Sequence, residues 1–375
     1  MPSVIHHPDY RRYTFGDAHP FSPVRVDMML DLLHALGHAV PAIEPEPATR
    51  ADLLGVHADY YVRRVEALSA GEPVADCQEY GLGTPDTPAF PGMDPAARWH
   101  VGGALHGARL ICEGGKRVLQ LGGGFHHAQR NAASGFCIYN DLAIAIEYLT
   151  RRGLWVAYLD IDVHHGDGVQ QIWYEDKRVM TISLHESGQF LFPGTGAVHE
   201  LGSGLGRGLK LNLPLEPFTE GASYLEVLDH VVPAALGHFR PGVLVVQAGA
   251  DAHFDDPLAD LMLTTRDYEA IFRRILRWAD RFTAGRVLFT LGGGYSLRAT
   301  PRVWTLLYLL IHDLPVPANL PEAWRRKWEA VLDRALPATL HDPDLSVDIP
   351  NRREIAHRNR QVAVRLLEAA EQYWF

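Results

Sequence analysis

The chain has 375 residues, 47% of them hydrophobic, and a formal net charge of −10, so its composition predicts a large core and excludes a basic nucleic-acid surface. Three widely spaced cysteines, Cys77, Cys112 and Cys137, exclude a disulfide framework and a Cys-x-x-Cys zinc site. No apolar run has membrane-spanning length and the first residues lack a signal-peptide pattern, so we expect a cytoplasmic protein that binds no membrane.

Short apolar runs alternate with helical patterns along the chain. The runs predict strands at residues 3–5, 117–121, 154–159, 178–185, 210–215, 242–249 and 286–291. Helical spacing of apolar residues predicts helices at residues 24–36, 95–113, 224–239, 268–282 and 303–312, with another that ends at residue 149. This alternation predicts one α/β domain in which helices cover both faces of a mostly parallel sheet. Residues 320–375 are charged and helical and carry no motif.

Two loops and two isolated histidines lie in the first third of the chain. The polar and aromatic loop at residues 8–20 either frames a pocket or is an ordinary solvated connection. Residues 80–93 are rich in glycine and proline and form a second loop, with Asp86 at its tip. His100 and His106 belong to the helix at residues 95–113, and we expect them on its surface rather than as ligands.

The densest polar cluster follows the apolar run at residues 154–159. Residues 159–168 read Leu-Asp-Ile-Asp-Val-His-His-Gly-Asp-Gly. If the strand continues through them, Asp160, Asp162 and His164 point in one direction, because side chains alternate along a strand. A carboxylate and an imidazole side by side suit zinc or another first-row divalent metal. The alternative is a polar strand end with hydrogen-bonded aspartates.

Other predicted strands also end in polar residues. His126 and His127 follow one strand after three glycines, Asp251 follows another, and Tyr295 follows a third, again after three glycines. Parallel α/β sheets bind ligands outside the carboxyl ends of their strands. These side chains therefore indicate one shared pocket.

At this point the sequence resembles the histone deacetylase family, specifically its bacterial acetoin-utilisation type, over about residues 5–315. The motifs are Gly-Gly-Gly-Phe-His-His-Ala (122–128), Ser-Gly-Phe-Cys-Ile-Tyr-Asn-Asp (134–141), Asp-Ile-Asp-Val-His-His-Gly-Asp-Gly-Val (160–169), Phe-Pro-Gly-Thr-Gly (192–196), Gly-Ala-Asp (249–251) and Leu-Gly-Gly-Gly-Tyr (291–295). The resemblance implies a single catalytic domain with the three-layer α/β/α arginase–deacetylase fold. It also implies zinc-dependent hydrolysis of N6-acetyl-lysine in proteins or peptides, which releases acetate.

The resemblance assigns the catalytic roles residue by residue. It makes Asp162, His164 and Asp251 the zinc ligands, a donor set that iron(II) also fits. His126 and His127 become a catalytic pair. In this assignment, Asp160 orients the ring of His126, and Asp167 orients the ring of His127. In the same assignment, the hydroxyl of Tyr295 binds the substrate carbonyl.

It also assigns the substrate contacts and the structural cations. Gly135, Phe136 and Phe192 match the tunnel around the acyl-lysine stem, Asp86 matches a rim aspartate in a loop one residue longer than in some relatives, and Leu258 occupies the gate position. A structural potassium ion is implied on oxygens of Asp160, Asp162, His164, Ser183 and Leu184. A second monovalent cation is implied beside Trp173, Asp176 and Val179.

Two departures from the family pattern and three rival functions accompany these assignments. Phe125 stands where many relatives have tryptophan, and Leu258 stands where polyamine deacetylases carry an acidic residue. The apolar Leu258 favours an acetyl-lysine stem over a free polyamine. The first rival is nevertheless deacetylation of acetylpolyamines or other small amides. The second is a two-metal ureohydrolase, and the third is a silent acetyl-lysine-binding protein. The sequence leaves open the physiological substrate, the acyl chain, the oligomeric state and the role of residues 320–375.

Overall fold

Eight parallel strands form one open sheet in the computed structural model, which describes residues 2–343, 349 and 351–374. Their order is β2-β1-β3-β8-β7-β4-β5-β6. The strands are β1 (Ser3–Ile5), β2 (Ala42–Ile43), β3 (Arg117–Gln120), β4 (Val156–Asp160), β5 (Val179–Glu186), β6 (Lys210–Leu215), β7 (Val243–Gln247) and β8 (Val287–Thr290). Every neighbouring pair runs parallel, which confirms the predicted α/β class; the two-residue β2 was missed.

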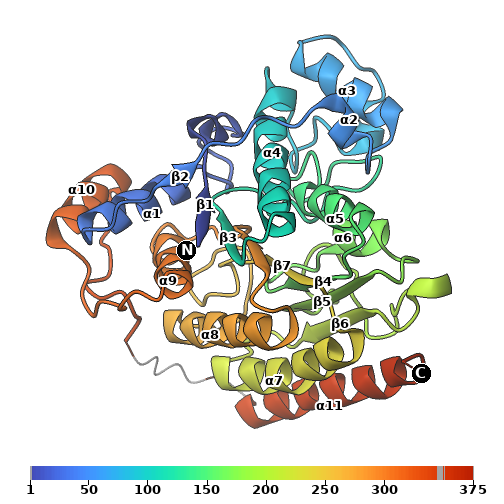
Figure 1. Cartoon of the computed structure of the whole chain (residues 1–375). Helices are drawn as coiled ribbons and strands as arrows, with labels where there is room; N and C mark the ends of the chain where they lie inside the picture. Colours follow the sequence, from blue (N-terminus) through green and yellow to red (C-terminus); the bar gives the residue numbers. More distant parts are fainter. Residues whose placement is uncertain (1, 344–348, 350, 375) are drawn as a thin grey trace.

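Helices cover both faces of this sheet (Figure 1). They are α1 (Val24–Ala35), α2 (Arg50–Leu53), α3 (Asp59–Ser69), α4 (Met93–Cys112), α5 (Asp141–Arg151), α6 (Asp167–Ile172), α7 (Gly221–Phe239), α8 (Thr265–Phe282), α9 (Thr300–Ile311), α10 (Glu322–Leu332) and α11 (Arg352–Glu371). Helices α4 and α5 lie on one face, whereas α7, α8 and α9 lie on the other, so the molecule has the predicted three layers. The one-and-a-half-turn α6 was not predicted.

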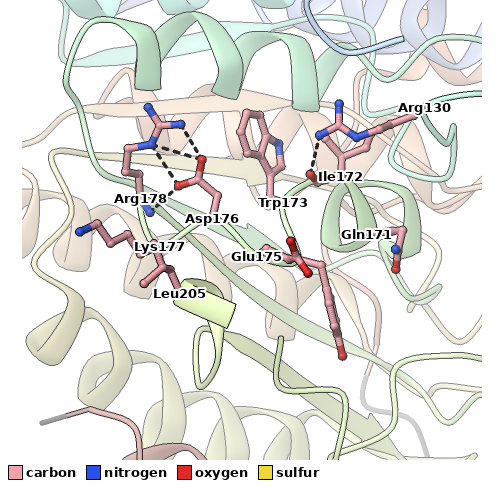
Figure 2. A pocket seen from close by; sticks show the side chains of 10 residues that line it. Arg130, Gln171, Ile172, Trp173, Glu175, Asp176, Lys177, Arg178 and Leu205 are labelled. Carbon is pink, nitrogen blue, oxygen red and sulfur yellow. Dashed lines mark hydrogen bonds and ion pairs between the residues drawn. The ribbon is translucent and has the colours of Figure 1, made fainter. Parts of the chain in front are cut away.

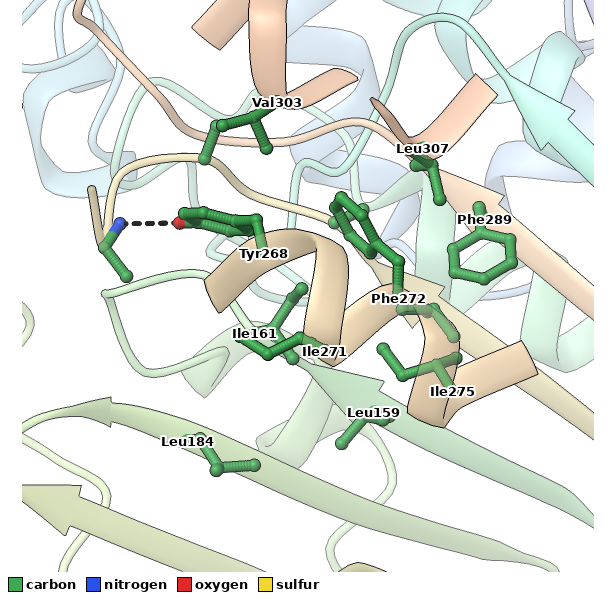
Figure 3. Close-up of a cluster of buried hydrophobic side chains, with 14 of the residues drawn as sticks. Leu159, Ile161, Leu184, Tyr268, Ile271, Phe272, Ile275, Phe289, Val303 and Leu307 are labelled. Carbon is green, nitrogen blue, oxygen red and sulfur yellow. Dashed lines mark hydrogen bonds between the residues drawn. The ribbon is translucent and has the colours of Figure 1, made fainter. Parts of the chain in front are cut away.

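The sheet separates two apolar cores, because alternate side chains of each strand point to opposite faces. In β4, Ala157 and Leu159 enter the core beneath α7, α8 and α9, whereas Val156 and Tyr158 enter the core beneath α4 and α5. Burial on both faces explains the uninterrupted apolar run in the sequence. Figure 3 shows the first core, where Tyr268, Ile271, Phe272 and Ile275 of α8 form one helical stripe over the strands.

Strand β4 ends earlier than the sequence suggested. The expectation of an extended strand through His164 is wrong, because the chain leaves the sheet after Asp160 and turns before α6. Carboxylates accept hydrogen bonds from the backbone of this turn: the Asp162 N–H donates to Asp160 Oδ1 at 3.1 Å and the Val163 N–H donates to Asp251 Oδ1 at 2.9 Å. The turn therefore brings the polar side chains together, not strand alternation.

The last part of the chain packs on the sheet and its helices. In α10, Trp324 Nε1 donates to the Met28 carbonyl at 3.0 Å and Trp328 Nε1 donates to Asp31 at 2.7 Å, which joins α10 to α1. Helix α11 packs on α7 and β6, and Asn359 Nδ2 donates to Thr219 Oγ1 at 2.8 Å. Within the described residues, no helix combines the length and the apolar composition that crossing a bilayer requires.

Candidate active site

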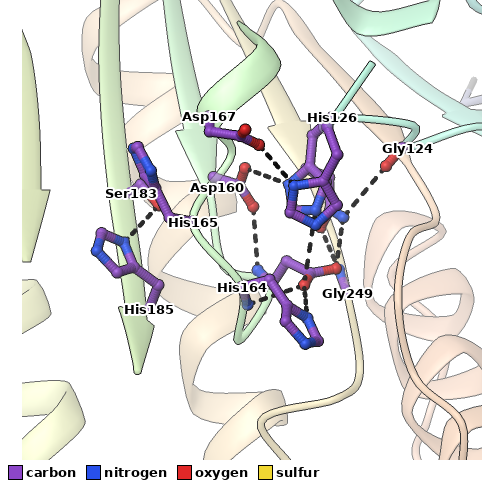
Figure 4. Close-up of polar contacts among 12 residues, drawn as sticks. Gly124, His126, Asp160, His164, His165, Asp167, Ser183, His185 and Gly249 are labelled. Atoms are coloured by element: carbon purple, nitrogen blue, oxygen red, sulfur yellow. Dashed lines mark hydrogen bonds and ion pairs between the residues drawn. The ribbon is translucent and has the colours of Figure 1, made fainter. Parts of the chain in front are cut away.

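Three buried side chains with metal-binding atoms meet beyond the carboxyl ends of β4 and β7. The donor atoms of Asp162, His164 and Asp251 all lie within 4.8 Å of one another. His164 Nδ1 is 3.1 Å from Asp162 Oδ1 and 3.3 Å from Asp251 Oδ2. Figure 4 shows how His164 lies beside the network that includes His126 and Asp160.

Neighbouring groups hold both carboxylates in place. Asp162 Oδ2 accepts hydrogen bonds from Gln247 Nε2 at 2.6 Å and from the Gly293 N–H at 2.9 Å. A side chain on Gly293 would be impossible, because its Cβ would lie 1.9 Å from Asp251 Oδ2. Only glycine therefore lets the loop after β8 pass this close to the cluster.

The cluster fits a divalent metal. Asp251 Oδ2 is fully buried and accepts no hydrogen bond, which is costly for a carboxylate without a cation. Burial and the Asp162 charge raise the pKa of Asp251 to about 8. Two carboxylates and one imidazole form a three-ligand set that leaves a further position for substrate, as in catalytic zinc sites. The predicted ligands therefore lie together as the sequence suggested.

His126 is buried between two carboxylates. Its Nδ1 lies 2.8 Å from Asp160 Oδ2, which also accepts the Tyr158 hydroxyl at 2.5 Å, and its Nε2 lies 3.8 Å from Asp162 Oδ1. Burial alone would lower the pKa of His126, but the charges of Asp160 and Asp162 outweigh it and raise the pKa to about 9. The two carboxylates therefore favour the protonated form of this ring.

His127 has the opposite protonation state. Its Nδ1 lies 2.7 Å from Asp167 Oδ1, and Gln129 Nε2 donates to the other oxygen of Asp167 at 2.9 Å. Burial and the adjacent charge of His126 lower the pKa of His127 to about 4, although Asp167 opposes them. The two ring centroids are only 4.0 Å apart, so the charge of His126 adds to the effect of burial on His127.

Tyr295 closes the same cavity from the loop after β8. Its N–H donates to Asp256 Oδ2 at 2.7 Å, and its ring meets the Phe136 ring edge-on at a centroid distance of 5.7 Å. Burial, followed by the charges of Asp251 and Asp162, raises the pKa of Tyr295 well above its usual value. The phenol is therefore a neutral hydrogen-bond donor. The cavity contains Tyr295 together with His126, His127 and Asp162.

The predicted substrate residues divide into two groups. Gly135 and Phe136 line the cavity, and the Phe192 ring lies 5.0 Å from that of His127 with 44% of its surface exposed. Asp86 Oδ2 accepts from the Gly135 N–H at 2.7 Å, so it holds the cavity wall. Leu258 is absent from the residues that line this cavity in the described part of the chain. It is linked to Tyr295 only through Asp256, whose Oδ1 accepts the Leu258 N–H at 3.0 Å.

The loop at residues 8–20 contributes to the pocket. The Tyr13 hydroxyl donates to the Phe136 carbonyl at 2.7 Å, and the His19 ring lies 4.5 Å from that of Phe136. Phe21, which follows the loop, lines the cavity. Of the two interpretations left open by the sequence, the structure favours a loop that frames the site.

His100 is buried, so its expected surface position is wrong, whereas His106 is partly exposed. The His100 ring stacks on Tyr10 at 4.4 Å, and its Nδ1 accepts from the Gly123 N–H at 3.0 Å. Small residues of α4 make this possible, since a Cβ on Gly103 would lie 2.1 Å from the Tyr10 hydroxyl. His100 therefore helps to fix the glycine loop before His126.

Sequence reasoning missed several buried polar residues around the site. Asp141 accepts from the Gly124 and Phe125 N–H groups at 3.0 and 2.8 Å. The Arg25 guanidinium is buried and donates to the carbonyls of Gly292 at 3.1 Å and Gly294 at 2.6 Å. An available signal was Gln247, the one polar residue in an otherwise apolar run at 242–249. Arg25 gave no signal, because one arginine in an amphipathic helix is ordinary.

The predicted potassium residues are neighbours across the sheet. Asp160 of β4 pairs in register with Ser183 of β5, and Ser183 Oγ lies 2.8 Å from His185 Nδ1. Their oxygen atoms are the type of ligand that alkali cations prefer, so a potassium ion at this place stays a prediction. At the second implied cation position, the Lys210 ammonium lies against the carbonyls of Asp176 and Val179.

Comparison with known proteins agrees with this geometry. The model of the histone deacetylase domain matches residues 19–311. The chain is 40% identical to the acetoin utilization protein AcuC of Bacillus subtilis over 372 residues, which cover 97% of this chain and 96% of that protein. It is 37% identical to AcuC of Staphylococcus aureus (strain MSSA476) over 366 residues, covering 95% and 93%.

Solved structures show the same fold. The crystal structure of an HDAC homolog complexed with SAHA superposes with a TM-score of 0.86 at 27% identity, covering 96% of this chain and 99% of that one. An HDAC homolog from Aquifex aeolicus gives a TM-score of 0.85 at 27% identity, with the same coverage. The arginase–deacetylase fold and the resemblance to acetoin-utilisation-type members are thereby confirmed. The chain belongs to the histone deacetylase family.

Proposed function

We propose that this deacetylase hydrolyses the acetyl amide of N6-acetyl-lysine in proteins or peptides, with zinc held by Asp162, His164 and Asp251. One observation carries the proposal: His126 and His127, each paired with its own aspartate, lie at one cavity beside the metal-type ligands and Tyr295. A protein that only binds acetyl-lysine would not need two imidazoles, each oriented by an aspartate, beside the metal-type ligands. Iron(II) fits the same three ligands.

The chain's own residues supply the proton transfers. Asp167 accepts the Nδ1–H of His127, which leaves Nε2 with a free lone pair that can take a proton from the attacking water. The same nitrogen then returns a proton to the leaving lysine amine. His126 carries a positive charge that Asp160 stabilises, and this charge favours the developing oxyanion.

Two further features act on the substrate carbonyl. The Tyr295 phenol is neutral and donates a hydrogen bond that strengthens as the oxygen gains negative charge. When bound, zinc would supply Lewis acidity toward the acetyl carbonyl and the attacking water. Arg25 holds the Gly292 and Gly294 carbonyls and therefore the loop that presents Tyr295.

The cavity suits a long apolar stem that ends in an uncharged amide. Phe136 lines it, and Phe192 lies above His127 at the exposed rim. Acetylation removes the charge of the lysine amine, so the stem can enter an aromatic tunnel without the cost of burying an ammonium. We propose that Asp86 holds the substrate backbone through its place on the tunnel wall at Gly135, and that Leu258 lies at the gate.

We further propose a structural potassium ion on oxygens of Asp160, Asp162, His164, Ser183 and Leu184. The register pair of Asp160 and Ser183 supports this assignment, since it brings two of the ligands side by side at the end of β4. The ion would stabilise the turn that carries the metal ligands. We treat the whole chain as one catalytic domain, because α10 and α11 pack directly on α1, α7 and β6.

Acetylpolyamines remain the second candidate substrate. The apolar Leu258 favours a peptide-borne stem, because it offers no negative charge to a free polyamine. A two-metal ureohydrolase would need further bridging carboxylates. Within the described residues, Asp162, His164 and Asp251 are the single group of metal-type ligands.

The deciding experiment compares acetate release from acetyl-lysine peptides and from acetylated polyamines, with the metal content of the same preparation measured. We expect turnover of the peptides at near-stoichiometric zinc or iron and at least about tenfold lower kcat/KM for polyamines, equivalent to about 1.4 kcal/mol. Preference for the polyamine would replace the substrate assignment. Binding of acetyl-lysine peptide without acetate release, with the metal in place, would show a silent binding protein.

A further inference from the structure

A buried lysine lies where strand β6 begins, at the amino ends of the strands, whereas the cavity lies beyond their carboxyl ends. Lys210 begins β6 and pairs in register with Thr181 of β5. Its side chain is fully buried, and its Nζ donates to the Val179 carbonyl and lies 3.4 Å from the Asp176 carbonyl. Within the described part of the chain, no carboxylate lies within 4.0 Å of Nζ, although buried lysines are rarely found without one.

The strand register explains why a carbonyl is available there. In a parallel ladder with Thr181 opposite Lys210, the Leu209 N–H would be the donor to the Val179 carbonyl. The Leu209 N–H instead donates to the Gly206 carbonyl at 3.1 Å. The Val179 carbonyl is therefore left without a backbone donor from β6, and the Lys210 ammonium provides the hydrogen bond.

The turn between α6 and β5 presents its carbonyls to this ammonium. The Asp176 carboxylate is turned toward Arg178, with which it makes hydrogen bonds of 3.0 and 2.5 Å (Figure 2). Only the backbone carbonyl of Asp176 is thus close to Nζ. The lysine stem has room because residue 202 is glycine, where a Cβ would lie 3.0 Å from Lys210 Cγ.

This arrangement disagrees with the second monovalent cation that the family resemblance implies beside Trp173, Asp176 and Val179. We propose that the Lys210 ammonium takes the place of that cation, so that this chain requires no potassium ion at the turn between α6 and β5. Carbonyl oxygens can replace the hydration shell of a monovalent cation. An ammonium is such a cation, with three donors and no acceptor.

Burial and the surrounding polar groups act in opposite directions on the charge of Lys210. Burial lowers the pKa of Lys210 to about 7, and the charge of Asp176 opposes that shift. The adjacent carbonyl oxygens can only accept hydrogen bonds, so they further favour the ammonium form. The ammonium contacts the turn that follows α6, the helix whose first residue, Asp167, pairs with His127. Lys210 therefore supports a segment that the catalytic site depends on.

Three variants test the proposal. Lys210→Ser removes the ammonium and opens space for an ion, whereas Lys210→Met removes the charge but fills most of that space. Lys177→Met is the matched control, because Lys177 belongs to the same turn and its side chain is exposed. Each protein is melted in potassium chloride and in choline chloride at equal ionic strength, and crystals are soaked with thallium(I), which anomalous scattering locates.

We expect no thallium near the Val179 carbonyl in the wild type and a thallium peak there in Lys210→Ser. In choline chloride both Lys210 variants should melt about 2–6 °C below the wild type, as expected for loss of one hydrogen-bonded buried group. Potassium should raise the melting temperature of Lys210→Ser by more than it raises that of the wild type. It should not raise the melting temperature of Lys210→Met in this way. The Lys177→Met control should follow the wild type in both salts.

Two results would overturn the proposal. One is a thallium ion on these carbonyls in the wild type, with the Lys210 side chain displaced. The other is an equal response of the Ser and Met variants to potassium. The first potassium position proposed above affects all four proteins alike, so the comparison among variants separates the two positions. If Lys210→Ser fails to fold, the wild-type anomalous map alone decides.

Discussion

The parallel strands bury charge in opposite ways at their two ends, which we call the carboxyl edge and the amino edge of the sheet. At the carboxyl edge, after β4 and β7, Asp162, His164 and Asp251 bring lone pairs together, and one oxygen of Asp251 accepts no hydrogen bond from the described residues. At the amino edge, where β5 and β6 begin, backbone carbonyls surround an ammonium that belongs to the chain. The first arrangement suits an exchangeable ion that reacts with substrate. The second suits a cation that the chain itself supplies and that stabilises a turn.

The largest effect should follow removal of a ligand at the carboxyl edge. Asp251→Asn keeps the shape of the side chain but lowers its charge, so metal affinity and turnover should fall together. We expect more than about a 100-fold loss of turnover, since even residues outside a ligand set can cost 10–100-fold. Metal content and acetate release measured on one preparation provide the check. Full occupancy with full turnover would refute the ligand assignment.

Replacement of the neutral imidazole should be nearly as damaging while leaving the metal bound. His127→Ala should lower turnover by about 100- to 10,000-fold, the usual contribution of a general base. His126→Ala is the matched control, because it removes the adjacent ring but not the base. A greater loss in His126→Ala, with near wild-type turnover in His127→Ala, would mean that the two roles are reversed.

Tyr295→Phe should come next in size. The variant loses one donor to the developing oxyanion, which typically costs about 100- to 1,000-fold in turnover. The ring that meets Phe136 is retained, so melting temperature and zinc content should stay at wild-type values. Turnover, melting temperature and zinc content are therefore measured side by side. Unchanged turnover would show that this tyrosine has only a structural role.

Acid should weaken metal binding at the carboxyl edge. The raised pKa of Asp251 means that the metal-free protein holds a proton there below pH 8, and metal must displace it. His164 must lose a proton as well, because burial would lower its pKa but Asp162 and Asp251 raise it to about 10. Between pH 8 and pH 6 the affinity should therefore fall by up to about a hundredfold per pH unit for these two protons. Titration of metal-free protein with zinc across that range measures the slope. A slope of only about tenfold per pH unit would mean that Asp251 is already ionised before metal binds.

The smallest change in turnover is expected for a third buried charge, Asp342, which the protein itself pairs with positively charged or hydrogen-bonding side chains. Asp342 accepts from Thr265 and lies 2.8 Å from His253 Nε2 and 2.9 Å from Arg302. Burial would raise the pKa of Asp342, but the His253 hydrogen bond and the Arg302 charge hold it well below its usual value. Asp342→Asn should lower the free energy of unfolding by about 3–5 kcal/mol with turnover changed only a few-fold.

The pH dependence of that stability distinguishes a charge effect from lost packing. A carboxyl whose pKa is lowered in the folded state stabilises the fold at pH values above its ordinary pKa, which is near 3.8. This stabilisation is lost as the pH falls through the pKa of the folded state. The difference in the free energy of unfolding between the wild type and Asp342→Asn should thus be constant from pH 7 to about pH 5 and become smaller below that. A difference that does not change with pH would indicate packing alone.

Much of the fold followed from local patterns. The run at residues 210–215 matches β6, and the helix at residues 224–239 ends where α7 ends, because strands buried on both faces and helices with one buried stripe leave strong periodic signals. The polar residues at strand ends also meet as expected, since parallel strands bring their carboxyl ends to one edge. The two-residue β2 and the short α6 carry too few residues for any period to be visible.

The sequence by itself determined which residue types gather at the carboxyl edge: the proposed metal ligands Asp162, His164 and Asp251, the paired histidines and Tyr295. Only the tertiary structure decided their states. His126 is charged and His127 neutral because of the different carboxylates and burial around each ring, and identical neighbouring residues carry no such difference in sequence. Likewise, Lys210 is an ordinary strand residue until the register of β5 and β6 leaves one carbonyl without a donor. Burial and distances between segments remote in sequence set these energies, so no local pattern could reveal them.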